Sequence, residues 1–376
     1  MLTRIGRKLT WMLGKLLPVK ANKVLVVSYY GRGYGDHAKY ITEELLRRRA
    51  DVKIFWAVKN KKEAEGLPAG VRPCRYDSVA FVYHQVTAGI WVDNCRRFFA
   101  YKKKNQFYLQ LWHGIPLKKI ERDAADKLEP EYVQAAQKDS SAIDLLVSDG
   151  EYTTRIYRSC FWYDGEIAAW GSPRNDVILN GNAELYGAVR RFFGLAPEKK
   201  LVLYAPTFRA DHSMTAYSLD AAALAAACEE RFGGDWAVLI RLHPNVAEQS
   251  KELFAYDGEH IVDATMYPDM QELLVAADFV ISDYSSLMFD FALSAKPCMQ
   301  FAADLEEYKG ERGFYLPLDG LPFPLAVNNE ELVQAVRQFE EQSYCEKLKQ
   351  FYGELGFVTD GKSAKRCADW ILAHIK

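Results

Sequence analysis

Short apolar runs of strand length alternate with helical stretches along most of this chain, and they do so in two successive rounds. Such alternation is typical of α/β sheets with parallel strands, in which each helix crosses back over the sheet. A length of 376 residues also exceeds what one hydrophobic core usually organises. We therefore expect two Rossmann-like domains that face each other.

The expected elements divide at turn-rich segments near residues 180–182 and 195–198. In the first round the expected strands are residues 24–29, 52–58, 89–93, 107–111, 145–148 and 166–170, and the helices are 36–49, 124–139 and 152–161. In the second round the strands are 201–205, 236–242, 279–282 and 297–301, and the helices are 221–231, 270–276 and 286–294. We assign residues 23–182 to an N-terminal domain and 183–376 to a C-terminal domain.

Residues 1–22 have the pattern of an amphipathic basic helix. Apolar residues recur at steps of three and four, at Leu2, Ile5, Leu9, Met12, Leu13, Leu16 and Leu17. Basic residues are interspersed at Arg4, Arg7, Lys8, Lys15 and Lys20, and Lys23 follows directly after the segment. This pattern favours a helix lying in a membrane interface, and the alternative is a first helix packed on the body of the protein. With no apolar run of about 20 residues and no secretory signal, we expect a peripheral protein on the cytoplasmic face of the membrane.

Charge and cysteine usage argue against nucleic-acid binding, a disulfide framework and a zinc site. The net charge of −2 gives no field strong enough to hold nucleic acid through its phosphates. The seven cysteines are odd in number, scattered, and never form a CxxC pair, which argues against a disulfide framework and a zinc site. We expect a reducing setting and no metal.

The segment 110–118 places a histidine at the end of an expected strand, and a glycine and a proline follow it. Ligands of open α/β sheets bind beyond the carboxyl ends of the strands. An imidazole titrates near neutral pH, so His113 can act as general base toward an attacking hydroxyl. A capping or core histidine is the alternative.

A second polar cluster, Arg241 and His243, ends another expected strand, and alternation places both side chains on the same side. A guanidinium binds phosphate oxygens in a fork, and an imidazole can stabilise charge on a transferred phosphoryl group. The alternative is a structural ion pair beside a turn histidine.

A third cluster runs from an expected strand into a helix and contains Asp283, Ser285 and Ser286. Serines at a helix start are strong caps, and two hydroxyls beside free N–H groups also suit a diphosphate. Thr207 with Arg209, and Arg312, are weaker candidates of the same kind. The glycines at 31, 33 and 35 do not form GxGxxG and predict a flexible loop.

Together these clusters resemble one family, the CDP-glycerol glycerophosphotransferases of teichoic acid and capsule synthesis. The matching strings follow the family's order over roughly residues 24–320: Trp112-His113-Gly114 with Pro116-Leu117-Lys118, Gly171-Ser172-Pro173-Arg174-Asn175-Asp176, Tyr204-Ala205-Pro206-Thr207, Arg241-Leu242-His243-Pro244, Asp283-Tyr284-Ser285-Ser286 with Phe289-Asp290, and Arg312-Gly313.

The resemblance implies a GT-B fold whose first domain meets the acceptor and whose second domain holds CDP-glycerol. It implies that His113 deprotonates the acceptor hydroxyl, with Gly114, Pro116 and Lys118 on the acceptor side. His243 would stabilise the β-phosphoryl group or the departing CMP. The implied donor contacts are Thr207, Arg209, Arg241, Asp283, Ser285, Ser286 and Arg312.

The implied reaction is attack of an acceptor hydroxyl on the glycerol-bearing phosphorus, which gives a phosphodiester and CMP. The expected partners are CDP-glycerol, a lipid-linked acceptor and the membrane surface, and no cofactor is expected. Only the short basic helix precedes the two expected domains, and this favours a primase-like enzyme that adds one or few units. CDP-ribitol is an alternative donor, and a GT-B glycosyltransferase, a nucleotide-sugar epimerase and a non-catalytic binding protein are rival functions.

Overall fold

A computed structural model describes residues 11–48, 51–97, 102–209, 215–243, 246, 253–308 and 313–375. The chain forms two compact units. Unit 1 contains Met1–Gly114, Ile120–Asp176 and Phe357–Lys376, and unit 2 contains Ile115–Lys119 and Val177–Gly356. This division differs from the expected one, because the chain changes unit at Asp176 and its last twenty residues return to unit 1.

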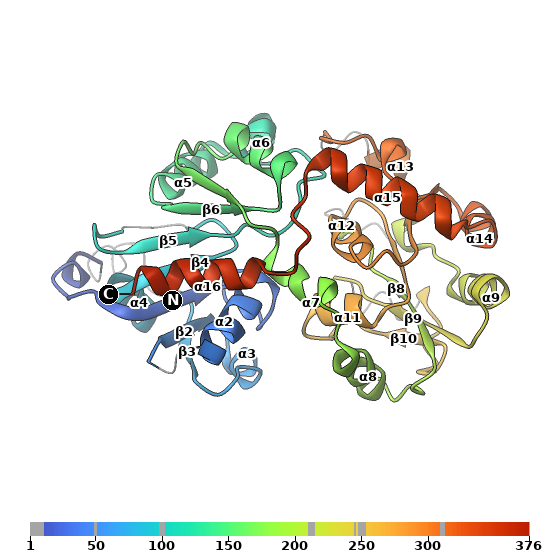
Figure 1. Cartoon of the computed structure of the whole chain (residues 1–376), viewed down its shortest axis with the longest axis horizontal. Helices are drawn as coiled ribbons and strands as arrows, with labels where there is room; N and C mark the ends of the chain where they lie inside the picture. The colour runs from blue at the N-terminus through green and yellow to red at the C-terminus, as the bar shows by residue number, and fades with distance from the viewer. Residues whose placement is uncertain are drawn as a thin grey trace. The chain divides into compact units, whose positions relative to one another are not determined.

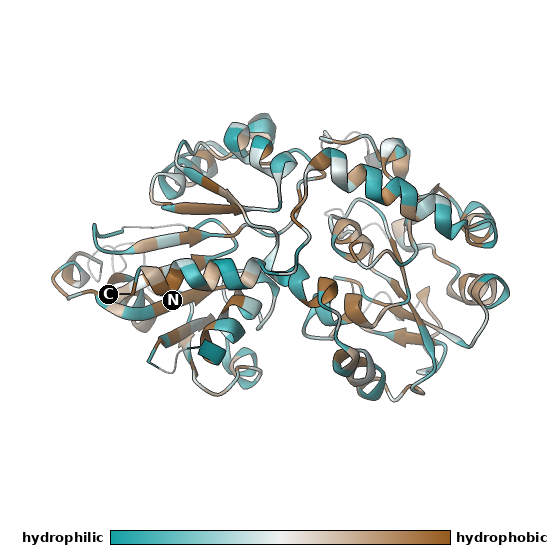
Figure 2. Ribbon diagram, in the orientation of Figure 1, coloured by the Kyte–Doolittle hydropathy of each residue, from teal (hydrophilic) through white to brown (hydrophobic). Residues whose placement is uncertain are grey.

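Unit 1 is built on a seven-stranded sheet in the order β3-β2-β1-β4-β5-β6-β7. All its neighbouring strands are parallel. The strands are β1 (Lys20–Val27), β2 (Lys53–Val58), β3 (Val71–Arg75), β4 (Ala88–Asp93), β5 (Phe107–Gln110), β6 (Leu145–Ser148) and β7 (Glu166–Ala169). Much of the length of these strands is brown in Figure 2, with teal and white stretches between, as expected for a sheet covered on both faces.

Helices cover both faces of this sheet, and they include the C-terminal helix of the chain (Figure 1). They are α2 (Asp36–Arg48), α3 (Lys61–Glu65), α4 (Val79–Thr87), α5 (Pro130–Ser140), α6 (Glu151–Cys160) and α16 (Ser363–Ala373), with 3-10 turns at Glu121–Lys127 and Pro173–Asn175. Cys367, Ala368 and Ile371 of α16 are fully buried in the same core as β1 and β2. Asp176 accepts hydrogen bonds from the backbone N–H groups of Ser363 and Ala364, which fixes the start of α16.

Unit 2 has a six-stranded parallel sheet in the order β10-β9-β8-β11-β12-β13. Its strands are β8 (Lys200–Tyr204), β9 (Trp236–Ile240), β10 (Ile261–Asp263), β11 (Phe279–Ser282), β12 (Cys298–Phe301) and β13 (Leu325–Ala326). Its helices are α7 (Asp176–Leu179), α8 (Ala183–Phe192), α9 (Ala221–Phe232), α11 (Met270–Ala276), α12 (Leu287–Ala292), α13 (Leu305–Tyr308), α14 (Asn329–Arg337) and α15 (Glu341–Leu355).

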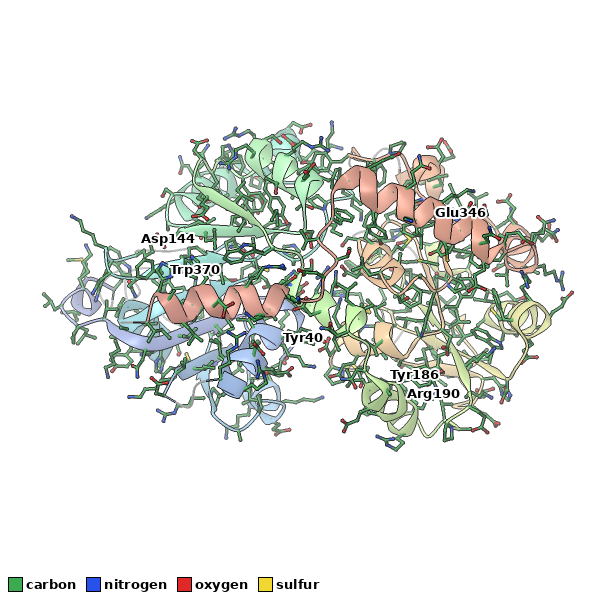
Figure 3. The ribbon with its side chains drawn as sticks, in the orientation of Figure 1. Tyr40, Asp144, Tyr186, Arg190, Glu346 and Trp370 are labelled. Atoms are coloured by element: carbon green, nitrogen blue, oxygen red, sulfur yellow. The ribbon has the colours of Figure 1, made fainter. Side chains whose placement is uncertain are left out.

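Helix α8 is held against the start of β11 by a partly buried polar cluster. Tyr186 and Arg190 lie one turn apart on α8, and the guanidinium of Arg190 lies 3.4 Å from the centre of the Tyr186 ring (Figure 3). Arg190 donates to Asp278 at 2.9 Å, and the Tyr186 hydroxyl donates to the same carboxylate at 3.2 Å. This cluster anchors the strand that carries Asp283 at its far end.

Proline explains two differences between expected and observed elements. The expected helix 124–139 is a 3-10 turn followed by α5, because Pro130 lacks an N–H and occupies the first turn of α5. The expectation also omits β3, which contains Pro73. A proline fits there because β3 lies at the edge of the sheet.

Of the expected N-terminal helix, residues 1–10 lie outside the described residues. Residues 11–14 are helical, whereas Lys20 already belongs to β1 and pairs with Ala88. Pro18 explains the end of the helical pattern, because it cannot donate a backbone hydrogen bond. No helix among the described residues is long and apolar enough to cross a membrane.

Candidate functional site

In each sheet there is one pair of neighbouring parallel strands from which the chain continues toward opposite edges of the sheet. Open α/β sheets bind ligands at this point. In unit 1 this point lies between β1 and β4, and in unit 2 between β8 and β11. Polar side chains gather just beyond the carboxyl ends of these strands in both units. Each unit therefore has its own candidate site.

The unit 1 site contains His113, three residues after β5. Trp112 stacks on the imidazole at 4.2 Å and has a left-handed φ of 52°. Gln110 stabilises this turn, because its side-chain oxygen accepts from the backbone N–H of Trp112 at 2.9 Å and its amide donates to the Cys95 carbonyl at 2.9 Å. The histidine is half-buried.

One hydrogen bond determines which nitrogen of His113 carries the proton. Nδ1 lies 2.6 Å from the carbonyl oxygen of Asn94, and a carbonyl can only accept. Nδ1 is therefore protonated, and in the neutral ring Nε2 keeps its lone pair. Burial lowers the pKa of His113, although the bond to Asn94 acts in the opposite direction. With the proton on Nδ1 and the pKa below its ordinary value, the imidazole can accept a proton at Nε2.

Asn94 connects His113 to the loop after β1. Its side chain is fully buried, and its Oδ1 accepts from the backbone N–H of Tyr29 at 2.9 Å. The Tyr29 ring lies 5.7 Å from the His113 ring. Asn94 thus binds His113 through its backbone carbonyl and the loop after β1 through its side-chain oxygen.

A buried ion pair lies beside this loop. Asp36 accepts from the Tyr29 hydroxyl at 2.6 Å and from Arg174 at 3.0 Å. Burial opposes ionisation of Asp36, but His37 and Arg174 keep its pKa below the ordinary value. Burial lowers the pKa of the adjacent His37 to about 3, so this second imidazole is neutral at physiological pH.

The loop with the three glycines is held in place, which differs from the flexible loop that we expected. The Trp56 ring nitrogen donates to the Gly33 carbonyl at 3.1 Å, and the Gly31 carbonyl accepts from the backbone of Lys59 at 2.9 Å.

The unit 2 site is organised by Asp283, which follows β11 and is 1% exposed. Its Oδ1 accepts from the backbone N–H of Thr207 at 2.8 Å, and its Oδ2 accepts from Arg209 at 2.8 Å. Arg209 also donates to Asp304 at 2.6 Å, and the Tyr284 hydroxyl donates to Asp304 at 3.0 Å. These buried contacts tie the loop after β8 to the loop after β11.

The remaining candidates of unit 2 are more exposed. Ser285 and Ser286 are half-buried, and the Ser285 hydroxyl accepts from the backbone of Leu287 at 3.3 Å, whereas Ser286 makes no side-chain cap. His243 is half-buried, with its ring 4.6 Å from the Phe208 ring. Arg241 donates to the Tyr267 carbonyl at 2.6 Å, and burial lowers its pKa. Arg312 lies outside the described residues.

The motif that begins at Trp112 is divided between the two units. His113 and Gly114 belong to unit 1, and Pro116 and Lys118 belong to unit 2. Lys118 pairs with Phe314, and its ammonium lies 6.0 Å from the centre of the Tyr284 ring. The structure thus places Lys118 beside the residues expected to hold the donor.

The family follows from comparison with known proteins. The sequence profile of the family described as CDP-Glycerol:Poly(glycerophosphate) glycerophosphotransferase matches residues 10–373. The chain belongs to this family.

Several glycerophosphotransferase relatives are similar over nearly the whole chain. The teichoic acid poly(glycerol phosphate) polymerase of Staphylococcus epidermidis is 32% identical over 95% of this chain and 51% of its own length. The teichoic acid glycerol-phosphate transferase of Staphylococcus aureus is 30% identical over 95% of both chains. The solved structure of the wall teichoic acid polymerase TagF is 30% identical, with a TM-score of 0.84 over 99% of this chain and 94% of its own. The fold is therefore GT-B-like.

The chain spans about half the length of the first of these relatives, the S. epidermidis polymerase, and also half of the Bacillus subtilis polymerase. No group of three or more metal-binding side chains occurs among the residues that the structure describes.

Three residues of these two candidate sites escaped the sequence-based prediction. Asn94 follows a predicted strand and Asp36 begins a predicted helix, but neither residue belongs to a local sequence motif. Asp304 pairs with Arg209 across 95 positions of sequence, which no spacing rule reveals. Arg174 lay within a matching string and had no assigned role.

Proposed function

We propose that this chain transfers glycerol phosphate from CDP-glycerol to a hydroxyl of a lipid-linked saccharide or polyol-phosphate acceptor in wall teichoic acid or capsule synthesis. The hydrogen bond from His113 Nδ1 to the Asn94 carbonyl carries this proposal, because it leaves Nε2 as a base at the ligand-binding point of the sheet. Family membership supplies the donor class. TagF was also solved after a soak with CDPG, and that structure is 29% identical to this chain.

In the proposed step, His113 Nε2 removes the proton of the acceptor hydroxyl as its oxygen attacks the β-phosphorus of CDP-glycerol. A new oxygen–phosphorus bond forms, and the bond from the β-phosphorus to the bridging oxygen breaks. The electron pair leaves with CMP. The products are a phosphodiester and CMP, and the proton is later released from His113.

The donor diphosphate is assigned to unit 2. Ser285 and Ser286 offer partly exposed hydroxyls, and His243 and Lys118 offer donors that can stabilise phosphate oxygens. Thr207, Arg241 and Arg312 complete the donor contacts implied by the family. Asp283 and Arg209 are almost fully enclosed by their own contacts, and we assign them to positioning the loops rather than to touching CDP-glycerol.

CDP-ribitol is the alternative donor, and similarity to the curated relatives favours glycerol. The glycerol phosphate polymerase of S. epidermidis is 32% identical to this chain. The poly(ribitol-phosphate) polymerase of Bacillus spizizenii is 26% identical.

The proposal is tested by incubating the purified chain with radiolabelled CDP-glycerol or CDP-ribitol and lipid-linked acceptors. We expect label to enter the lipid fraction from CDP-glycerol at the higher rate, with one CMP released for each unit transferred. Absence of transfer from both donors to every acceptor would refute the proposal.

The pH dependence of kcat/KM tests the base directly. His113 must be neutral to accept a proton, so the rate falls when pH drops through its pKa. Because burial lowers that pKa, we expect the midpoint of the acidic limb below the ordinary histidine value of about 6.5. Initial rates between pH 4.5 and 8 measure it. A midpoint above 6.5 in the free enzyme contradicts this assignment.

We further propose that the segment before β1 rests on the membrane surface. Its apolar side chains Met12, Leu13, Leu16 and Leu17 are 60%, 62%, 84% and 39% exposed. The opposite side is packed, since Lys103 donates to the Gly14 and Leu17 carbonyls at 3.2 and 2.6 Å. An exposed apolar stripe with Lys15 nearby suits an anionic interface.

Substitution of Leu13 and Leu16 by glutamate is therefore expected to weaken binding to anionic liposomes by about tenfold or more, because two leucine side chains no longer enter the membrane interface. Sedimentation with liposomes measures the bound fraction. Phe192→Glu is the matched control, since Phe192 is 62% exposed on α8 of unit 2. Equal binding of the wild type and both variants would show that this segment is not the membrane anchor.

A further inference from the structure

A second feature of the carboxyl edge of unit 1 is a pocket of about 610 Å³. It lies over the neighbouring strands β1, β2 and β3. Tyr30 follows β1, Lys59 follows β2, and Arg75 ends β3, and all three line the pocket. Neither the family strings nor the roles assigned above include any of these residues.

The walls of this pocket are well defined. The backbone of Lys59 donates to the Gly31 carbonyl at 2.9 Å, and the backbone of Tyr76 donates to the Val58 carbonyl at 2.8 Å. Gly31 has a φ of +87°, and a Cβ there would lie 3.1 Å from the Cβ of Tyr76. The loop after β1 is thus pressed against the ends of β2 and β3, so the pocket keeps its shape.

The pocket carries a net positive charge. Lys59 and Arg75 are exposed, and neither has an ion-pair partner among the residues that the structure describes. Asp77 also lines the pocket and offsets one of these two charges. The first turn of α4, capped by the Ser78 hydroxyl, adds partial positive charge at the same place. An anion is the ligand that this lining favours.

The pocket shares a loop with the candidate base. Tyr29 is bound to Asn94 and lies next to His113, and the following residue, Tyr30, lines the pocket. Both tyrosines have left-handed backbone angles, with φ of 42° and 59°. A ligand that contacts Tyr30 in this pocket is therefore bound by the residue next to Tyr29, whose ring lies beside His113.

We propose that this pocket binds a phosphate group of the acceptor while the acceptor hydroxyl lies at His113, an inference that rests on the proposed function. The donor diphosphate is assigned to unit 2, so an anion site on unit 1 is left for the other substrate. The rings of Tyr30 and Tyr76, 6.3 Å apart, supply an apolar wall for the carbon atoms beside the phosphate. Two sources have this chemistry: the diphosphate of the lipid carrier, and the phosphodiester of a unit already transferred.

The test is a double variant, Lys59→Gln with Arg75→Gln, compared with Lys53→Gln with Arg72→Gln. The control removes the same two side-chain types at the opposite ends of β2 and β3, because Lys53 begins β2 and Arg72 lies near the start of β3. We expect the pocket variant to raise KM for the acceptor about tenfold, since hydrogen bonds to charged groups are lost. KM for CDP-glycerol stays near the wild-type value, and the control matches wild type in both constants.

Two acceptors distinguish the sources of the phosphate. One is a lipid diphosphate-linked saccharide without glycerol phosphate, and the other is a saccharide with one glycerol phosphate on a phosphate-free alkyl carrier. A raised KM for only one of them identifies that source and supports the pocket. Wild-type KM values of the pocket variant for both acceptors overturn the inference and leave the proposed function intact.

A binding measurement keeps the pocket testable if the chain does not use CDP-glycerol. Titration calorimetry at low salt with a glycerol phosphate trimer and with inorganic pyrophosphate needs no turnover. Binding by wild type and control that is lost in the pocket variant supports the anion site. Equal affinity of all three proteins, or no binding by any of them, overturns it.

Discussion

Replacement of His113 by asparagine is expected to lower kcat by about 100- to 10,000-fold, the range typical for loss of a general base. The amide nitrogen of asparagine occupies nearly the place of Nδ1 and can still donate to the Asn94 carbonyl. The variant therefore keeps the local hydrogen bond of His113 and loses only Nε2. KM for CDP-glycerol should stay near the wild-type value, since the donor is assigned to unit 2. Steady-state kinetics with saturating acceptor measures both constants.

The matched control is His260→Asn, because His260 is an exposed histidine on a loop of unit 2. It is expected to leave kcat unchanged. Circular dichroism and thermal unfolding of both variants separate loss of catalysis from loss of structure. A folded His113→Asn variant with a wild-type kcat contradicts the role of this histidine.

Replacement of Arg209 by methionine is expected to reduce the free energy of unfolding of unit 2 by about 3–5 kcal/mol. Arg209 is 3% exposed, and its guanidinium lies against the carboxylates of Asp283 and Asp304. Removal of the guanidinium leaves the buried carboxylate of Asp283 and the partly buried carboxylate of Asp304 without their cation, which costs more than the loss of the ion pairs themselves. Urea unfolding, with hydrogen exchange of peptides from β8 and β11, measures the effect in unit 2.

Arg337→Met is the control for the loss of an arginine ion pair. Arg337 pairs with Glu230 at 2.8 Å, and their side chains are 48% and 61% exposed. Solvent screening limits such pairs to about 1 kcal/mol or less. Equal losses from the two substitutions would mean that Arg209 does not organise the loops after β8 and β11.

Local sequence patterns predicted the central elements well. The expected ranges 145–148, 270–276 and 279–282 coincide with β6, α11 and β11. These elements are short, apolar and bounded by polar residues, so local preference and tertiary environment agree. The edge strands β3, β10 and β13 were missed, because an edge strand needs less apolar surface and tolerates residues such as Pro73.

The return of the chain to unit 1 could not be predicted from local patterns. Helix α16 is fixed by Asp176, which lies 187 positions before Ser363. The same limit applies to the site. His113 and Asp283 were identified because each follows an apolar strand, whereas the carbonyl of Asn94 acts through its position alone. Lys118 was expected on the acceptor side, and only tertiary contacts show that it lies with Tyr284 in unit 2.

The central claim is transfer of glycerol phosphate with loss of CMP, and phosphorus NMR of the reaction tests it most directly. With CDP-glycerol and a lipid-linked acceptor, we predict that the diphosphate resonances disappear while CMP and a new phosphodiester resonance appear in equal amounts. The His113→Asn variant should show neither change on the same time scale. Unchanged diphosphate resonances with the wild-type chain and every acceptor, or CMP released with free glycerol phosphate in place of the phosphodiester, would contradict the account.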